Sequence, residues 1–255
     1  MSETDTQVHL YWATGCTSCL RAKEFLERNE VPFASHNVIE DWGLLDEMEA
    51  RGLPRQVPIV RRGDDWADAQ GLDEVARIAG VEHEADPLPV DELYRRLDLV
   101  LETVERYLGL FSEAQLAVDI PNRPRSVGEL SYHTFSVVAS FLDHEDGVPL
   151  TSYEPELAWT NRSTDALTTY GEHVRTRLRD WYEGPGRERD FSETASVYYG
   201  DPTVHEFFER TTWHAGQHAR QLEWMLAETF PVDAEPLDPS TWEGLPMPEK
   251  VWDAA

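Results

Sequence analysis

The sequence predicts two domains, an α/β domain followed by an all-α domain that forms a four-helix bundle. Three observations support this fold class. Strand-like and helix-like segments alternate over residues 1–80, only helical periodicity follows from residue 91, and residues 81–90 lose periodicity while gaining prolines and acids. We therefore expect domains at residues 1–80 and 91–255, joined by a linker at residues 81–90.

The first domain is expected to alternate strands with helices. A buried strand runs into a turn at residues 13–15, and a turn at residues 63–65 indicates a hairpin. The expected elements are a strand at 8–12, a helix at 16–29, a strand at 32–38, a helix at 44–51, a strand at 57–60, a short strand near Trp66 and a helix at 71–79. The predicted order is β-α-β-α-β-β-α.

The second domain shows apolar residues at every third or fourth position. Ser126 followed by Glu129 forms a capping-box pattern before the second helix. Asp201 and Pro202 precede the fourth helix, where Asp can cap and Pro can occupy the first helical position. The expected helices lie at about 93–108, 127–141, 167–181 and 203–229. Four such helices can bury one another's apolar stripes as a bundle.

The C-terminal region differs from these helices in composition. Its last 25 residues contain five prolines together with Trp242 and Trp252. Because proline interrupts helices, we expect this region to pack as an irregular strap that belongs to the helical domain.

The charge balance excludes one class of partner. The sequence has 49 acidic and 22 basic residues, a formal net charge of −27, and this opposes binding to nucleic acid, which requires clustered cations. No apolar run of about 18 residues and no signal-peptide pattern occur, so the sequence predicts no membrane contact. We expect an acidic protein that stays in the cytoplasm.

The two cysteines, Cys16 and Cys19, lie where the first strand gives way to a helix. The positive end of a helix favours a thiolate, which makes Cys16 the candidate nucleophile. Cys19 lies one turn later and could attack a mixed disulfide on Cys16. A structural zinc would need a second ligand pair, which no other cysteine supplies. We predict a catalytic redox dithiol; the alternative is two incidental cysteines in a helix cap.

Residues 7–80 resemble a glutaredoxin. The resemblance is carried by Leu10-Tyr11, Cys16-Thr17-Ser18-Cys19, Val57-Pro58 and Gly71-Leu72-Asp73. It implies a thioredoxin fold, a cis-proline at Val57-Pro58 whose backbone pairs with a thiol ligand, and contact between residues 71–73 and the carboxylate end of that ligand. Thr17 and Ser18 stand where the family commonly has Pro and Tyr, so the co-substrate is glutathione or another low-molecular-weight thiol. A thioredoxin fold that has lost its activity is the alternative.

Three histidines of the second domain form a candidate metal site. His214 and His218 lie four residues apart and share one face of the fourth expected helix. His133 lies on the apolar face of the second expected helix and could point toward them. Three neutral imidazoles with an open coordination position suit zinc or nickel. Ordinary helix-face histidines are the alternative.

Residues 89–252 resemble the DinB-like family of four-helix bundles. The resemblance is carried by residues 126–133, which end in His133, and by residues 213–220, which contain His214 and His218. It implies that these three histidines are metal ligands. Because the family overlaps thiol-dependent metal transferases, it also implies a metal-dependent transferase for a low-molecular-weight thiol, and by analogy a homodimer.

The sequence thus predicts a thiol-disulfide oxidoreductase fused to a metal-dependent thiol S-transferase, acting on small thiol and disulfide substrates. The main alternative is a redox domain joined to a non-catalytic metal-binding or dimerisation bundle. Hydrolysis through a metal-bound water ranks last, because no general base is identifiable by its spacing.

Overall fold

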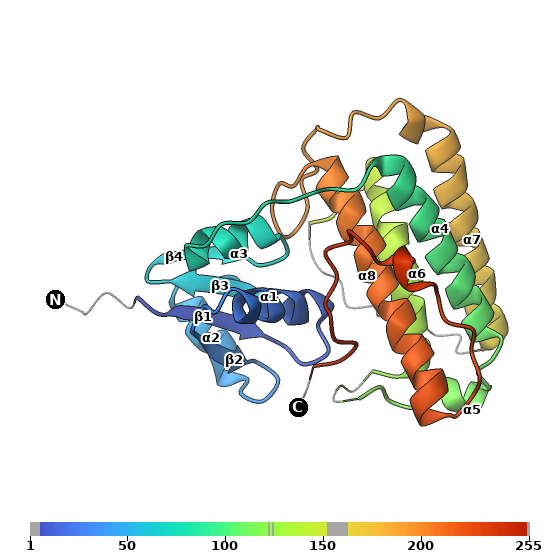
Figure 1. Ribbon diagram of the computed structural model, residues 1–255, viewed down its shortest axis with the longest axis horizontal. Coiled ribbons are helices and arrows are strands. Elements are labelled where there is room, and N and C mark those ends of the chain that lie inside the picture. Colours follow the sequence, from blue (N-terminus) through green and yellow to red (C-terminus); the bar gives the residue numbers. More distant parts are fainter. Residues whose placement is uncertain (1–5, 122, 124, 152–162, 254–255) are drawn as a thin grey trace. The chain divides into compact units, whose positions relative to one another are not determined.

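The computed structural model describes residues 6–121, 123, 125–151 and 163–253, and the chain divides into two compact units (Figure 1). The first unit contains the residues up to Asp86 and also those from Pro248 onward, whereas the second spans Pro87–Met247. We call them the redox unit, after the redox dithiol predicted within it, and the helical unit. The sequence placed the whole C-terminal region with the helices, and the structure differs because backbone amides after Pro248 bind a side chain of the redox unit.

The redox unit has the element order expected from the sequence. Its elements are β1 (Val8–Trp12), α1 (Thr17–Arg28), β2 (Phe33–Asn37), α2 (Gly43–Ala50), β3 (Ile59–Arg62), β4 (Asp65–Asp68) and α3 (Leu72–Ala79). The sheet order is β2-β1-β3-β4. Strand β1 pairs parallel with β2 and antiparallel with β3, and β3 pairs antiparallel with β4.

Helices cover both faces of this sheet, because the side chains of β1 alternate in direction. Leu10 and Trp12 belong to a hydrophobic cluster shared with α1 and α3. Tyr11 points to the other face, into a cluster that includes Met48 of α2. This central sheet with helices on both faces is a thioredoxin-like fold, and it places the start of α1 at the end of a buried strand.

Within its described residues, the regular secondary structure of the second unit is entirely helical. The helices are α4 (Val90–Leu108), α5 (Glu113–Leu116), α6 (Val127–Glu145), α7 (Thr164–Glu183) and α8 (Val204–Trp224), with short helical turns at Pro185–Arg187, Met225–Thr229 and Pro239–Thr241. Helices α4 and α6 each pack against both α7 and α8 (Figure 1). In the part of the chain that the structure describes, every helix is too short or too polar to cross a membrane.

The helix starts follow the sequence in one case and depart from it in another. Ser126 and Glu129 form the expected capping box before α6. At α8 the cap is Thr203, whose backbone amide donates to the Glu206 carboxylate at 2.6 Å. The expected cap Asp201 instead accepts a hydrogen bond from Ser196 at 2.7 Å. Thr203 is the cap because it forms a capping box with Glu206, in which each side chain accepts a hydrogen bond from the backbone amide of the other residue.

Helices α6 and α7 approach each other closely at Gly171. A Cβ added to this glycine would lie 2.5 Å from Cζ of Phe135, a fully buried ring on α6. Only a residue without a side chain fits this crossing. Phe135 lies two residues after His133, so the same crossing fixes the part of α6 that carries this histidine.

Candidate functional sites

The dithiol lies at the N-terminus of α1, as the sequence predicts. Gly15 has a φ of 73°, which few residues other than glycine adopt, and it turns the chain into the helix. Cys16 is the N-cap residue, and its Sγ accepts a hydrogen bond from the backbone amide of Cys19 at 3.2 Å. The two cysteines form a disulfide with a Cα–Cα distance of 5.2 Å. The structure therefore shows the oxidised dithiol.

The two sulfurs differ in their surroundings. Cys16 is half-buried, whereas Cys19 is fully buried. The first turn of α1 contains no acidic residue, so the partial positive charge of the helix end is not offset within the helix. Such a helix end generally favours a thiolate, and Cys16 is the more accessible of the two sulfurs.

The residues expected to bind a thiol lie in two segments of the redox unit. The Val57–Pro58 peptide bond is cis, and Val57 packs against the same two hydrophobic clusters as Cys16. Gly71 is the N-cap of α3. The Leu72 side chain is buried in the core, and Asp73 is exposed.

Gln70 joins the start of α3 to the first turns of α1. Its side-chain oxygen accepts a hydrogen bond from the Ser18 hydroxyl at 2.5 Å, and its carbonyl accepts one from the buried Arg21. The amide-rich start of α3 is thereby held against the helix that carries the dithiol. Such a helix start can receive the carboxylate of a small ligand.

The residues from Pro248 to Asp253, which we call the C-terminal strap, lie against α1. The backbone amides of Glu249 and Lys250 donate to the two carboxylate oxygens of buried Glu24, at 2.6 and 3.0 Å. Asp253, at the end of the described strap, is 6% exposed. Its pKa is raised to about 6, chiefly by burial. Sequence reasoning missed this residue because the strap contacts join positions as many as 226 residues apart.

The three candidate histidines converge inside the helical unit. His133 comes from α6, and His214 and His218 come from α8. One ring nitrogen from each of the three lies within 4.8 Å of the others. Hydrophobic residues at neighbouring positions turn these faces of α6 and α8 inward, so the imidazoles are withdrawn from solvent.

The ring nitrogens of this cluster suit a metal ion. Nδ1 of His214 and Nε2 of His218 are buried and have no hydrogen-bond partner. Nδ1 of His218 lies 2.7 Å from Oε1 of Gln221; because this oxygen only accepts, Nδ1 carries the proton and the lone pair of Nε2 remains open. Metal-bound histidines typically have such a support on the second nitrogen.

Burial favours the neutral form of His214 and His218. The pKa of His214 lies well below its usual value because of burial, with a smaller contribution from His218. Burial likewise lowers the pKa of His218. A neutral imidazole is the form that binds a metal. Gln221, which sequence reasoning missed, could have been suggested by its position three residues after His218 on the same helix.

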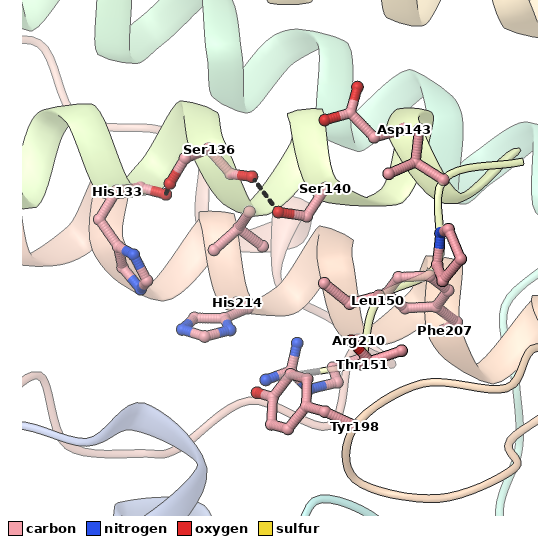
Figure 2. Close-up of a pocket in the computed structure, with 13 residues that line it drawn as sticks. His133, Ser136, Ser140, Asp143, Leu150, Thr151, Tyr198, Phe207, Arg210 and His214 are labelled. Carbon is pink, nitrogen blue, oxygen red and sulfur yellow. Dashed lines mark hydrogen bonds between the residues drawn. The ribbon is translucent and has the colours of Figure 1, made fainter. Parts of the chain in front are cut away.

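A cavity of about 330 Å³ opens beside the histidines, and His133 and His214 lie at one end of it (Figure 2). Ser136 and Ser140 line this cavity, and their hydroxyls donate hydrogen bonds to backbone carbonyls of α6. The other described lining residues are Val137, Asp143, Val148, Pro149, Leu150, Thr151, Tyr198, Phe207 and Arg210. The cavity offers a mixed polar and apolar site for a small molecule.

The fold and the helix-capping dithiol define a thioredoxin-fold redox domain. Comparison with known proteins supports this class: residues 8–66 match the glutaredoxin family. The chain is also similar to the global transcriptional regulator Spx of Bacillus subtilis (strain 168), with 23% identity over 128 residues that cover 47% of this chain and 91% of the relative.

Proposed function

We propose that this chain is a glutaredoxin-type thiol-disulfide oxidoreductase whose helical unit is a metal-dependent transferase for a low-molecular-weight thiol. The observation that carries the first half is the position of Cys16, half-buried at the start of α1 with Cys19 bonded behind it. The match of residues 8–66 to glutaredoxins supports the same activity.

The dithiol chemistry requires both cysteines. The Cys16 thiolate attacks one sulfur of a substrate disulfide, forms a mixed disulfide and releases the other sulfur as a thiolate, which takes up a proton. Cys19 loses its proton and attacks Sγ of Cys16, which releases the second thiolate and closes the Cys16–Cys19 bond. Two electrons pass from the dithiol to the substrate. Two molecules of a small thiol, glutathione or another, return the pair to its reduced form.

Two cysteine variants test this assignment. In Cys16→Ser we expect reduction of a small mixed disulfide to fall to the background rate, because the attacking sulfur is missing. In Cys19→Ser the first step remains, so the small thiol should stay attached to Cys16 and be detected by mass spectrometry of the intact protein. Unchanged turnover in Cys16→Ser would refute the catalytic assignment.

For the helical unit, we propose that His133, His214 and His218 hold a divalent metal, zinc or nickel. The unpartnered buried nitrogens and the Gln221 support favour this assignment, as does the resemblance of this region to DinB-like bundles. A bound metal would keep a small thiol deprotonated at neutral pH. The cavity beside the histidines would hold the electrophile.

Elemental analysis of the purified full chain tests the metal site. We expect about one metal ion per chain, lost in His218→Ala and retained in His173→Ala, which removes an exposed histidine of α7. No metal in the unmodified chain would contradict the proposal.

Transferase activity is tested in the Cys16→Ser chain, so that the dithiol does not contribute. Conjugation of a small thiol to electrophiles should depend on the metal and disappear in His218→Ala. Metal binding without turnover across a broad panel of electrophiles would favour the alternative, a non-catalytic metal-binding or dimerisation bundle.

We propose small thiols and disulfides as the partners of this chain, and a cytoplasmic site of action with neither nucleic acid nor membrane. The Bacillus subtilis relative is a transcriptional regulator, but the net charge of −27 of this chain opposes contact with a phosphate backbone. Pairing of two chains through the helical unit remains a prediction that a measurement of mass in solution would test.

A further inference from the structure

The C-terminal strap runs along α1 toward the dithiol. Glu249 lies near the C-terminal end of this helix, where it forms an ion pair with Arg28 at 3.1 Å, and Lys250 lies 3.8 Å from Glu27. Asp253 lies at the other end, beside the backbone amide of Gly15. The strap is therefore antiparallel to α1, and its described end reaches the residue that precedes Cys16.

Asp253 is a buried carboxyl with little compensation. Both of its oxygens are withdrawn from solvent and form no hydrogen bond of good geometry. The charged groups that face it are Lys23 and Glu24 of α1 and Lys250 of the strap itself.

The ammonium group of Lys23 is also engaged elsewhere. It lies over the ring of Trp12, 4.3 Å from the ring centroid, and no ion pair with Asp253 forms within 4.0 Å in the described structure. A buried carboxyl with so little compensation destabilises a fold, and such a group in a native protein calls for an explanation.

We propose that Asp253 is a positioning residue of the dithiol site, where its carboxylate opposes the thiolate form of Cys16 and thereby sets how the reactivity of the site depends on pH. The inference rests on the dithiol activity proposed above. It adds that the C-terminal strap contributes to a site whose other parts lie within the first 73 residues.

The direction of the effect follows from the repulsion between two negative charges. When Cys16 loses its proton, an ionised Asp253 nearby disfavours the new negative charge, so the carboxyl and the thiol share one proton over a range of pH. Burial has already raised the pKa of Asp253 to about 6, which brings its titration close to the working range of a reactive cysteine. Below that range the carboxyl is neutral and the opposition disappears.

Alkylation of the reduced full-length chain by iodoacetamide, followed at Cys16 by peptide mass spectrometry, tests this inference without requiring turnover. In Asp253→Asn we expect Cys16 to react roughly three to ten times faster at pH 6.5. The two rates should converge at pH 5, where Asp253 is protonated in the unmodified chain. The disulfide of the variant should also be reduced more readily against a thiol/disulfide buffer.

Two further variants separate the charge of Asp253 from the docking of the strap. Glu249→Gln removes an exposed partner from the same strap and should leave the alkylation profile unchanged. Glu24→Gln weakens the attachment of the strap, so we expect it to increase the rate of alkylation at Cys16 as Asp253→Asn does. Protection of the strap from proteolysis reports whether it remains docked.

The outcomes distinguish this inference from the proposed enzyme activity. An unchanged pH profile in Asp253→Asn, with the strap docked or released, overturns the role of Asp253 even if the chain reduces disulfides. Faster alkylation in Glu24→Gln together with an unchanged rate in docked Asp253→Asn also overturns it, because the strap would then act only by covering Cys16.

Discussion

The dithiol of the redox unit and the three-histidine cluster of the helical unit are built in opposite ways. Cys16 and Cys19 lie within one turn of a single helix, and their geometry follows from where α1 begins. His133 meets His214 and His218 only because α6 packs against α8. The first site is local in the sequence, whereas the second depends on the packing of two helices.

The two sites also differ in how far their side chains are exposed to solvent. Cys16 is half-buried and open to a substrate, while His218 is 2% exposed. Burial favours the neutral imidazole of His214 and of His218, whereas the positive end of a helix generally favours a thiolate. A perturbation of helix packing in the helical unit should therefore affect the proposed metal site and leave the dithiol intact.

The largest expected effect concerns the hydrogen bond between His218 and Gln221. Gln221→Leu removes the acceptor from Nδ1 of His218, so the ring loses its orientation and we expect metal affinity to fall roughly 10- to 100-fold. Gln217→Leu is the matched control, because Gln217 is buried on the same helix but bonds to Arg220. Competition with a metal chelator measures the metal affinity of both variants. Equal affinity in the two would argue against a role of the Gln221–His218 hydrogen bond in metal binding.

A change in helix packing should weaken the proposed metal site without affecting the dithiol. Gly171→Ala places a methyl group against Phe135, so we expect the free energy of unfolding of the helical unit to fall by about 1–3 kcal/mol. Metal affinity should weaken because α6 shifts, while alkylation of Cys16 stays as it was. Gly109→Ala, where the added carbon meets only an ordinary contact, serves as the control in denaturant unfolding.

The smallest expected effect is a pH dependence of stability in the redox unit. The folded state raises the pKa of Asp253 from 3.8 to about 6, so it binds this proton more tightly than the unfolded state does. The associated stability is present below about pH 4 and lost as the pH rises through 6. We expect Asp253→Asn to remove about 1–2 kcal/mol of this decrease. Denaturant unfolding at pH 4.5 and 7.5 gives the free energy of unfolding of each protein. An equal change in this free energy between the two pH values for both proteins would contradict the prediction.

Much of the redox unit could be predicted from the sequence. Alternating apolar residues in β1, the glycine turn and the start of a helix at Cys16 are local patterns, and each constrains the backbone within a few residues. The order of strands and helices follows from them. The cis bond at Val57–Pro58, implied by the resemblance to glutaredoxins, is present in the structure.

The expectations that failed involve a choice between competing partners. Asp201 and Thr203 are both good capping residues, and Thr203 caps α8 because Glu206 lies three residues after it. The C-terminal prolines indicated an irregular segment but carried no information about the surface that it covers. Only the folded chain shows that Glu24 receives the amides of Glu249 and Lys250.

The sequence by itself determined the helix-capping dithiol, the four amphipathic helices and the residue types of the histidine cluster, since each depends on spacing along one segment. The tertiary structure alone decided that His133 reaches the α8 pair, that a cavity opens beside them and that Asp253 returns to the start of α1. The physical reason is that hydrogen bonding and side-chain periodicity act over a few residues, whereas burial brings together residues that no local pattern relates.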